Sequence, residues 1–326
     1  MCERNRMELV SDARVAEKVR WARLSIVSNV FLTALKLAVG LAMLSISVLS
    51  EAAHSGLDLL AAIIANVAVV KSARPPDREH AFGHGKFENL SAVAEAALIL
   101  VAAGAIIAEA ILRILNPVEV GLLPAGIAVM GVSALVNFAV SRKLFQIARR
   151  TESAALEADA LHLSTDVWTS AGVLWGLVLI HLTGLVILDP ILAILVAVLI
   201  VHAAWRLTVK SARELTDHTL PEEEMRRIRA VVERHRDRFV EFHGLRARKA
   251  GAERHIDLHV VMARDTHVDD AHELCDALER EIENELDGSR VLVHIEPCAR
   301  HCPECGSRDE CHAFLDSGSE DRAKII

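Results

Sequence analysis

The chain changes character once along its length, because long apolar stretches fill the first two thirds and charged residues dominate the last third. A helix needs about 20 mainly apolar residues to cross the hydrocarbon core of a bilayer. Six stretches have this length, so the pattern predicts six membrane-spanning helices. They are Leu24–Leu44, Ile46–Val70, Leu90–Leu112, Val120–Val140, Ala158–Leu182 and Ile187–Leu207.

Shorter periodicities in the last third predict a small soluble domain. In Glu253–Met262 apolar and polar residues alternate, as in a strand with one buried face, and Arg290–Glu296 repeats this pattern. Pro221–Arg236 and Val268–Leu286 have the spacing of amphipathic helices. The order helix, strand, strand, helix, strand predicts a small α+β domain.

The predicted fold class is therefore an α-helical membrane protein followed by an α+β domain, in four parts. These parts are an N-terminal segment (1–23), the six-helix transmembrane domain (24–207), the soluble domain (208–298) and a tail rich in Cys and His (299–326). Lys and Arg gather before the first apolar stretch and after the second, fourth and sixth. Positive residues stay on the cytoplasmic side, so both termini are predicted to be cytoplasmic.

Overall charge and cysteine usage narrow the range of partners. The net charge of -8 argues against nucleic acid as a partner. The chain has six cysteines, and four of them fall between 298 and 311, beside histidines. This clustering favours metal ligation over disulfides. Cys302 and Cys305 form a C-P-x-C-G knuckle that suits zinc, and the alternative is a metal-scavenging tail without fixed geometry.

Two matching motifs occur in the second and fifth apolar stretches. His54 and Asp58 form one H-x-x-x-D pair, and His162 and Asp166 form the other. Residues four apart share one face of a helix. Ionisable groups at membrane depth face the interior of the bundle, and two imidazoles with two carboxylates suit tetrahedral zinc. The alternative is a hydrogen-bonding device between helices, but two matching pairs favour a metal site.

The charge of these four groups suggests how transport would be driven. Zinc bound by two aspartates and two neutral imidazoles gives a site of zero formal charge. Without metal the site carries two negative charges in a low-dielectric environment, and protons can neutralise them. Metal and protons therefore compete for the same groups, which predicts exchange of one for the other across the membrane.

At these motifs the sequence resembles the cation diffusion facilitator family. The paired motifs, the loop Arg74–Lys86 and the soluble domain after the sixth apolar stretch carry the resemblance. It implies proton-coupled efflux of a divalent metal by a homodimer, with a ferredoxin-like cytoplasmic domain, in a bacterial inner membrane. It also assigns the transport site to the two H-x-x-x-D pairs. Histidine at position 54 resembles the more zinc-restricted members, with cadmium, cobalt or iron left open as further cargo.

The same resemblance implies two further metal sites and one charged pair. Asp77, His80 and His84 would bind a second ion in the loop, although turns in an exposed loop explain them as well. A cytoplasmic zinc site at the dimer contact would use His243, His259, His272, His294 and Glu296, which otherwise lie on solvated faces. Lys86 and Asp217 would tie the membrane domain to the cytoplasmic domain.

Two other functions compete with a metal/proton antiporter. An intramembrane metalloprotease needs a motif such as H-E-x-x-H, and the sequence contains none. A non-transporting metal sensor would use the cytoplasmic histidines, but it has no need of ionisable pairs at membrane depth. The expected protein is thus a secondary transporter and not an enzyme.

Overall fold

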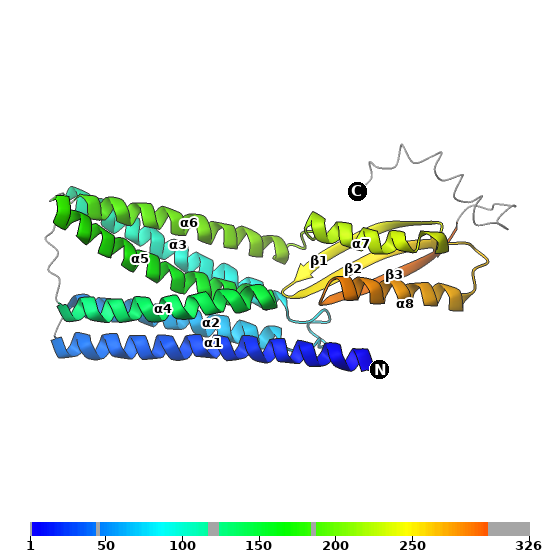
Figure 1. Ribbon diagram of the computed structural model, residues 1–326, viewed down its shortest axis with the longest axis horizontal. Helices are drawn as coiled ribbons and strands as arrows, with labels where there is room; N and C mark the ends of the chain where they lie inside the picture. Colours follow the sequence, from blue (N-terminus) through cyan, green and yellow to red (C-terminus); the bar gives the residue numbers. More distant parts are fainter. Residues whose placement is uncertain (1, 44–45, 117–123, 184–186, 299–326) are drawn as a thin grey trace. The chain divides into compact units, whose positions relative to one another are not determined.

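The chain forms two compact units, one ending at Thr216 and the other beginning at Asp217 (Figure 1). The first unit is a bundle of helices, and the second is a layer of helices on a sheet. The computed structural model describes residues 2–43, 46–116, 124–183 and 187–298.

Six long helices lie side by side in the first unit. They are α1 (Cys2–Met43), α2 (Ile46–Ser72), α3 (Lys86–Leu115), α4 (Pro124–Thr151), α5 (Ala154–Thr183) and α6 (Leu188–Leu215). α1 packs on α2, α4 packs on α5, and α3 packs on α6. Many buried core residues here are alanines, such as Ala61, Ala103 and Ala204. Small side chains at helix contacts let the backbones approach closely, as in other membrane bundles.

The outer surface of the bundle is apolar, as a bilayer requires. Large apolar side chains point outward on several helices, among them Phe31, Leu135 and Leu199. By length and composition, four stretches among the described residues could cross a membrane: Ala13–Val39, His54–Ser72, Lys86–Leu115 and Pro190–Leu215. The helix predicted to end at Leu207 continues for two further turns to Leu215, since amphipathic residues prolong it beyond the apolar stretch.

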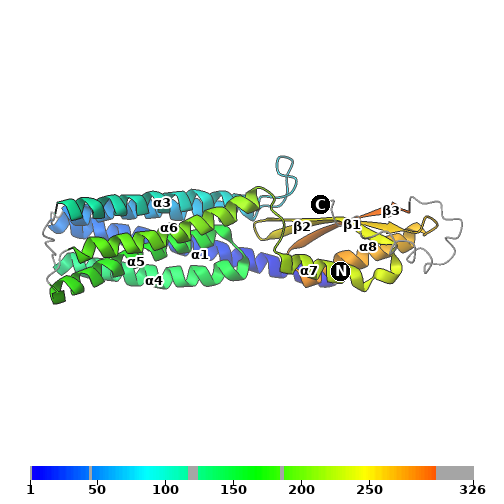
Figure 2. The same ribbon diagram turned by 90° about the horizontal axis from the view of Figure 1, so that it is seen from above.

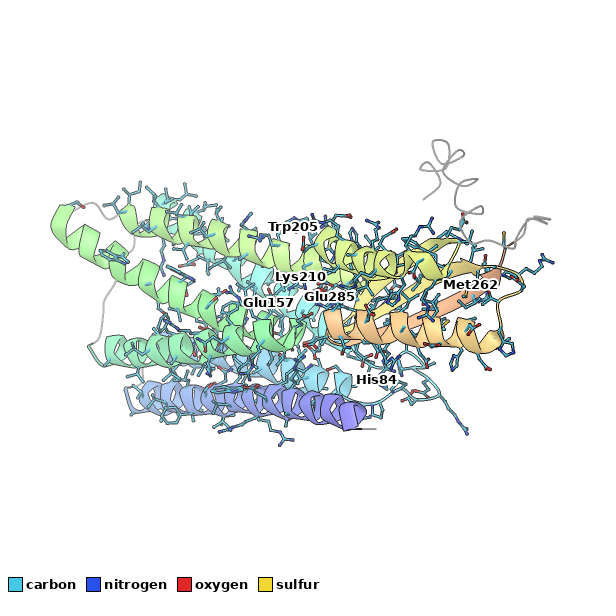
Figure 3. The ribbon with its side chains drawn as sticks, turned by 45° about the vertical axis from the view of Figure 1, so that its right-hand side comes forward. His84, Glu157, Trp205, Lys210, Met262 and Glu285 are labelled. Atoms are coloured by element: carbon cyan, nitrogen blue, oxygen red, sulfur yellow. The ribbon has the colours of Figure 1, made fainter. Side chains whose placement is uncertain are left out.

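A buried carboxylate joins the helices at the end of the bundle where α5 begins. Glu88 of α3 is 1% exposed and accepts hydrogen bonds from Lys18 of α1 (2.8 Å) and Ser72 of α2 (2.7 Å). Ser153, between α4 and α5, donates to its other oxygen. A buried charge is tolerated only when it is paired and hydrogen-bonded, and Glu88 meets both conditions. On the side of the bundle, Lys210 of α6 reaches Glu157 of α5 at 2.5 Å (Figure 3).

The second unit is a three-stranded sheet with two helices on one face (Figure 2). In chain order it contains α7 (Glu222–Arg234), a short 3-10 helix (Arg236–Arg238), β1 (Glu241–Ala250), β2 (Glu253–Met262), α8 (Val268–Glu285) and β3 (Ser289–Pro297). β2 pairs antiparallel with β1 and parallel with β3, and α8 makes the crossover that a parallel pair needs.

The core of this unit lies between the sheet and the helices, as the alternation along β2 predicts. Ile256, Leu258 and Val260 are fully buried against residues of α7 and α8, such as Ile228 and Leu278. The polar residues between them therefore occupy the opposite face of the sheet. β2 has the predicted bounds, and α7, α8 and β3 differ from theirs by one or two residues at their ends. The predicted α+β class is confirmed.

Candidate metal sites

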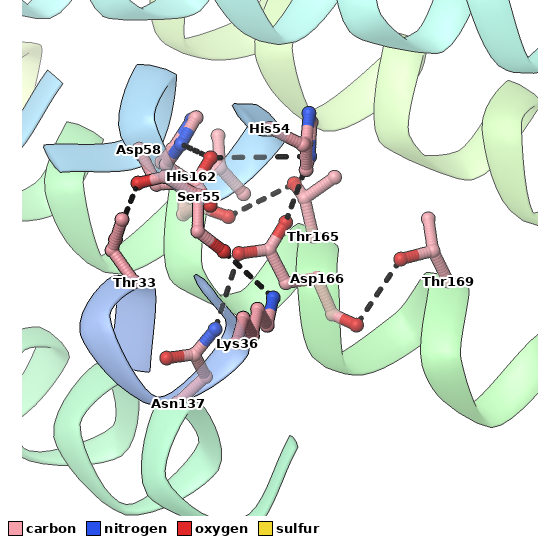
Figure 4. A network of polar contacts seen from close by, with 11 residues as sticks. Thr33, Lys36, His54, Ser55, Asp58, Asn137, His162, Thr165, Asp166 and Thr169 are labelled. Atoms are coloured by element: carbon pink, nitrogen blue, oxygen red, sulfur yellow. Dashed lines mark hydrogen bonds and ion pairs between the residues drawn. The ribbon is translucent and has the colours of Figure 1, made fainter. Parts of the chain in front are cut away.

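The two H-x-x-x-D pairs meet between α2 and α5, and together they form the helix-pair site (His54, Asp58, His162 and Asp166; Figure 4). Nε2 of His162 lies 3.0 Å from Oδ1 of Asp58. Nε2 of His54 lies 3.9 Å from Oδ1 of Asp58 and 3.9 Å from Oδ1 of Asp166. One turn of helix separates the members of each pair, so facing helices bring all four together.

Ligand atoms of His54, Asp58 and Asp166 all lie within 4.8 Å of one another. Ligands of one zinc ion lie about 2.0–2.2 Å from it, and therefore at most about 4.4 Å apart. The separations of 3.9 Å from His54 to each aspartate fall within that limit, and His162 is joined to the group through Asp58 at 3.0 Å. The side chains of Asp58 and His162 are 5% and 9% exposed, whereas that of His54 is 45% exposed. His54 consequently marks the open side of the site.

Three further polar residues complete this network: Lys36 and Ser55, which the sequence analysis missed, and Asn137, which from sequence alone reads as a packing or hydration device. Lys36 of α1 is buried, and its Nζ donates to Oγ of Ser55 at 2.7 Å. Asn137 of α4 donates to Oδ2 of Asp166 at 3.1 Å. Such partners orient ligands and adjust their basicity. The sequence did contain a signal for Lys36, because it is a single lysine within a long apolar stretch, eight residues before that stretch ends.

The predicted loop residues Asp77, His80 and His84 form a second compact group, and their ligand atoms lie within 4.8 Å of one another. His84 is 4% exposed, with its Nε2 at 3.2 Å from Oδ2 of Asp77. The backbone of His80 donates to Oδ1 of Asp77 at 2.7 Å, which lowers the pKa of Asp77 and keeps it ionised. Phe87 packs against both imidazole rings and fixes their positions.

On the face of the sheet away from the helices, four predicted ligands form the sheet-face cluster (His243, His259, His294 and Glu296). Nδ1 of His259 lies 2.7 Å from Oε1 of Glu296. His243 and His294 approach the same carboxylate at 3.5 Å and 3.8 Å. The strand register explains this arrangement, because His259 pairs with His243 on one side and with His294 on the other. The hydrogen bond from His259 lowers the pKa of Glu296.

His272, the fifth predicted cytoplasmic ligand, lies apart from this cluster on α8. Its side chain is 75% exposed and approaches Asp276 at 3.9 Å. His272 and Glu296 nevertheless line the same open hollow of about 410 Å³, between the start of α8 and the end of β3. Met262 forms part of its wall (Figure 3). The hollow therefore places His272 near the acidic end of the cluster.

Two further predictions, the Lys86–Asp217 pair and the Cys302–Cys305 knuckle, are not tested by the described residues. Lys86 belongs to the first unit and donates to the carbonyl of Leu215 at 3.2 Å. Asp217 belongs to the second unit, where it accepts from Arg248 at 3.0 Å. The Lys86–Asp217 pair thus stays a prediction. Cys302 and Cys305 of the proposed knuckle lie outside the described residues.

Comparisons with known proteins agree with the division into two units. Residues 22–216 match the family model of the cation efflux transmembrane domain, and residues 220–298 match that of the cation efflux protein, cytoplasmic domain. An uncharacterized transporter of Synechocystis is 37% identical, over 78% of this chain and 82% of its own. The cation-efflux pump FieF of Shewanella oneidensis is 30% identical, over 85% of this chain and 93% of its own.

Among solved structures, one of a candidate zinc transporter, CzrB, in its zinc form is 41% identical, covering 26% of this chain and 98% of that one with a TM-score of 0.25. A helical membrane domain with histidine and carboxylate clusters, followed by a cytoplasmic domain of this type, defines a metal-cation efflux transporter. The chain belongs to the cation efflux family, which is the cation diffusion facilitator family that its motifs resemble.

Proposed function

We propose that this transporter exports zinc from the cytoplasm in exchange for protons, through the helix-pair site. The observation that carries the proposal is the convergence of two imidazoles and two carboxylates from α2 and α5 in a mostly buried position. Mixed nitrogen and oxygen ligands in this number suit zinc. Manganese and magnesium favour oxygen ligands alone, so the two histidines select against them.

The contact between His162 and Asp58 supports the proton-coupled step. A hydrogen lies between Nε2 of His162 and Oδ1 of Asp58, which are 3.0 Å apart. A metal ion that takes both atoms as ligands displaces this hydrogen, because metal ligands must be deprotonated to bind. Release of the metal on the other side leaves buried carboxylates, which recover protons there. The cycle is then an exchange of metal for protons.

In this proposal all six helices cross the membrane and both termini are cytoplasmic. Four basic residues at the ends of α2 and α4, Lys71, Arg74, Arg149 and Arg150, lie at the end of the bundle that carries the 72–86 loop. Positive residues mark the cytoplasmic side. The transporter works as a homodimer, and the cytoplasmic dimer-type domain supports this part of the proposal.

The loop group and the sheet-face cluster are proposed as additional zinc sites with regulatory or structural roles. Histidines around one carboxylate on an exposed sheet face can take up metal without a change in the membrane unit. His272 completes the site from α8, and the hollow that it shares with Glu296 supports this assignment. The Lys86–Asp217 pair would carry the effect of cytoplasmic zinc to the membrane unit.

Flux through purified transporter in proteoliposomes tests the function directly. Zinc should accumulate against its gradient when a pH gradient is imposed, and the pH gradient should dissipate as zinc moves. Cadmium, cobalt, iron and manganese, each tested in competition, define the metal range. Zinc binding without flux would instead support the non-transporting sensor, and flux that ignores the pH gradient would remove proton exchange from the proposal.

A further inference from the structure

Two more carboxylates are buried in the membrane unit and belong to none of the sites above. Glu95 of α3 is 0% exposed and Asp159 of α5 is 1% exposed. They lie close enough to interact electrostatically. Around them α3 and α5 meet through small side chains, Ala92 and Ala96 on one helix and Ala154 and Ala158 on the other, in a single packed cluster. The close approach of the two helices excludes water from both carboxylates.

The polar atoms around this pair have unused hydrogen-bonding capacity. Oε2 of Glu95 makes no hydrogen bond with any described residue. The fully buried hydroxyl of Ser25 is a neighbouring donor for the two oxygens of Asp159, but it does not reach regular hydrogen-bonding geometry with either of them. Ser25 of α1 lies beside the Asp159 carboxylate. Only Oε1 of Glu95 is satisfied, by the hydroxyl of Ser91 at 2.9 Å. Buried polar groups are nearly always partnered, so these under-satisfied carboxyl oxygens leave room for a further ligand, either a proton or a cation.

Glu88 shows what a purely structural carboxylate looks like on the same helix. It lies seven residues before Glu95, on the same face of α3, and it is paired with Lys18 and two hydroxyls. Within the described part of the chain, neither Glu95 nor Asp159 has a Lys or Arg partner. An unpaired buried charge is far more costly than a paired one. A proton or a cation from solution therefore has to neutralise the pair.

The pair also lies between the helix-pair site and the end of the bundle with the 72–86 loop. Asp159 precedes His162 by three residues on α5, so both side chains lie on one face about one turn apart. The two side chains also interact electrostatically. A cation that enters from the loop end and moves along this face of α5 meets Asp159 before it meets His162.

We propose that Glu95, Asp159 and Ser25 form a second intramembrane site for a divalent cation, the entry site, which the cargo metal occupies on its way to the helix-pair site. This inference rests on the proposed efflux function. The donors are all oxygens, which hold zinc less selectively than a site with two imidazoles. The protein supplies an incomplete coordination shell, so the ion has to keep some of the water ligands that it carries in. A weak site of this kind passes the ion onward and does not retain it.

The test uses the full-length transporter in proteoliposomes, with Glu95→Gln and Asp159→Asn combined. These changes keep side-chain shape and remove both charges. The entry site predicts that kcat/KM for zinc falls about tenfold, the size expected when a charged path no longer concentrates its ion. The zinc affinity of the helix-pair site should stay unchanged. That affinity is obtained from zinc titrations as the component of binding that disappears when Asp58→Asn is introduced into the same protein. Asp159→Glu, which keeps a carboxylate, should retain most of the flux.

Glu109→Gln is the matched control, because Glu109 is an exposed carboxylate of α3 whose side chain is 59% exposed, and it should leave kcat/KM unchanged. An unchanged kcat/KM in the double variant overturns the entry site and leaves the efflux function standing. A parallel fall in flux and zinc affinity also overturns it, because the pair would then act by shaping the helix-pair site. If the unmodified transporter moves no zinc, the efflux function fails first and the entry site fails with it.

Discussion

The helix-pair site and the sheet-face cluster use the same two kinds of ligand in opposite surroundings. In the helix-pair site, Asp58 is 5% exposed and faces residues from other helices. In the sheet-face cluster, Glu296 is 35% exposed and His294 is 61% exposed, on the face opposite the one on which α7 and α8 pack. The types of ligand alone therefore do not determine what a cluster of imidazole and carboxylate groups does. How far the cluster is exposed to water also determines it.

In the buried helix-pair site, binding of metal is coupled to the charges of neighbouring groups. In the exposed sheet-face cluster, metal can bind without such compensation. At the helix-pair site the carboxylates are largely shielded from water, so Lys36 and displaced or recovered protons have to balance their charge, while the amide of Asn137 orients Asp166. On the sheet face, water and salt screen the same charges. We therefore expect loss of a ligand to stop transport at the first site and to modulate it at the second.

The largest effect is expected from Asp58→Asn, which keeps shape but removes the carboxylate that His162 contacts at 3.0 Å. Zinc flux in proteoliposomes should fall by more than the roughly 10–100-fold that loss of an outer-shell partner costs. The matched variant is Glu296→Gln, the central carboxylate of the sheet-face cluster, which should keep most of the flux. Equal losses in the two variants would break the distinction between the sites.

The two pairs of the helix-pair site follow from local spacing in the sequence, whereas the sheet-face cluster was expected only from the resemblance to the cation diffusion facilitator family. The spacing of four residues in His54–Asp58 and His162–Asp166 places each pair on one face of a helix, whatever the tertiary structure. The alternation in β2 places His255 and His259 on one face of the sheet. Local periodicity is sufficient for each helix pair because both of its members lie in one regular element; α2 begins as predicted and ends two residues later, and β2 has the predicted bounds.

What the sequence did not reveal depends on contacts between distant elements. Lys36 and Ser55 lie nineteen residues apart on different helices, and nothing in their local pattern links them. Asn137 reaches Asp166 from a third helix. The spacing alone puts Asp159 on the face of His162, but its proximity to Glu95 appears only once α3 and α5 pack together. A charge inside an apolar stretch signals function in general, but only packing identifies its partner.

The next largest effect, on zinc affinity, is expected from a change at Lys36. This lysine places a positive charge beside the helix-pair site, and the sheet-face cluster is the site with which it is compared. With Lys36 charged, the metal-free site carries one net negative charge, where the four ligands alone would carry two. Lys36→Met should therefore tighten zinc binding by about tenfold or more, since like charges a few ångströms apart interact by more than the 1.4 kcal/mol that a tenfold change requires.

Zinc titration of the full-length transporter measures this change in affinity. Repeating the titration with Asp58→Asn present identifies which part of the binding belongs to the helix-pair site. Lys36→Arg keeps the charge and should keep the affinity close to that of the unmodified protein. Weaker zinc binding in Lys36→Met would show that Lys36 acts by orienting Ser55 and α2, and that its charge has little influence on the metal.

A smaller effect is expected from His259→Ala combined with His294→Ala. These changes remove two imidazoles around Glu296, so zinc should no longer stabilise the cytoplasmic unit, as a ligand of the folded state does. Thermal melting of the full-length protein with and without zinc should lose several degrees of zinc-dependent stabilisation, while flux continues at a reduced rate. If the full thermal shift persists, its source lies elsewhere, with the Cys302–Cys305 segment as the first candidate.

The smallest effect concerns the two ends of the exposed sheet face, where histidines have opposite neighbours. His259 bonds to Glu296, whereas His255 pairs across the strands with Arg248 and Arg290. Partial burial first, and then the charge of Arg248, lower the pKa of His255 from its ordinary 6.5. The unfolded chain therefore binds this proton more strongly, so stability decreases as the pH falls below 6.5.

Glu296 loses its contribution in a separate window. Its pKa lies below the ordinary 4.5, because of the hydrogen bond from His259, so its stabilisation is present above that pH and is lost only in stronger acid. His255→Gln should raise the melting temperature of the cytoplasmic unit by about 1–2 °C at about pH 5.5 and leave it unchanged at about pH 7.5. His259→Gln, the matched change at the acidic end, should not reproduce that rise, because it leaves the His255 proton in place. An equal rise in both variants would mean that the two ends of the sheet face do not differ in the way their neighbours suggest.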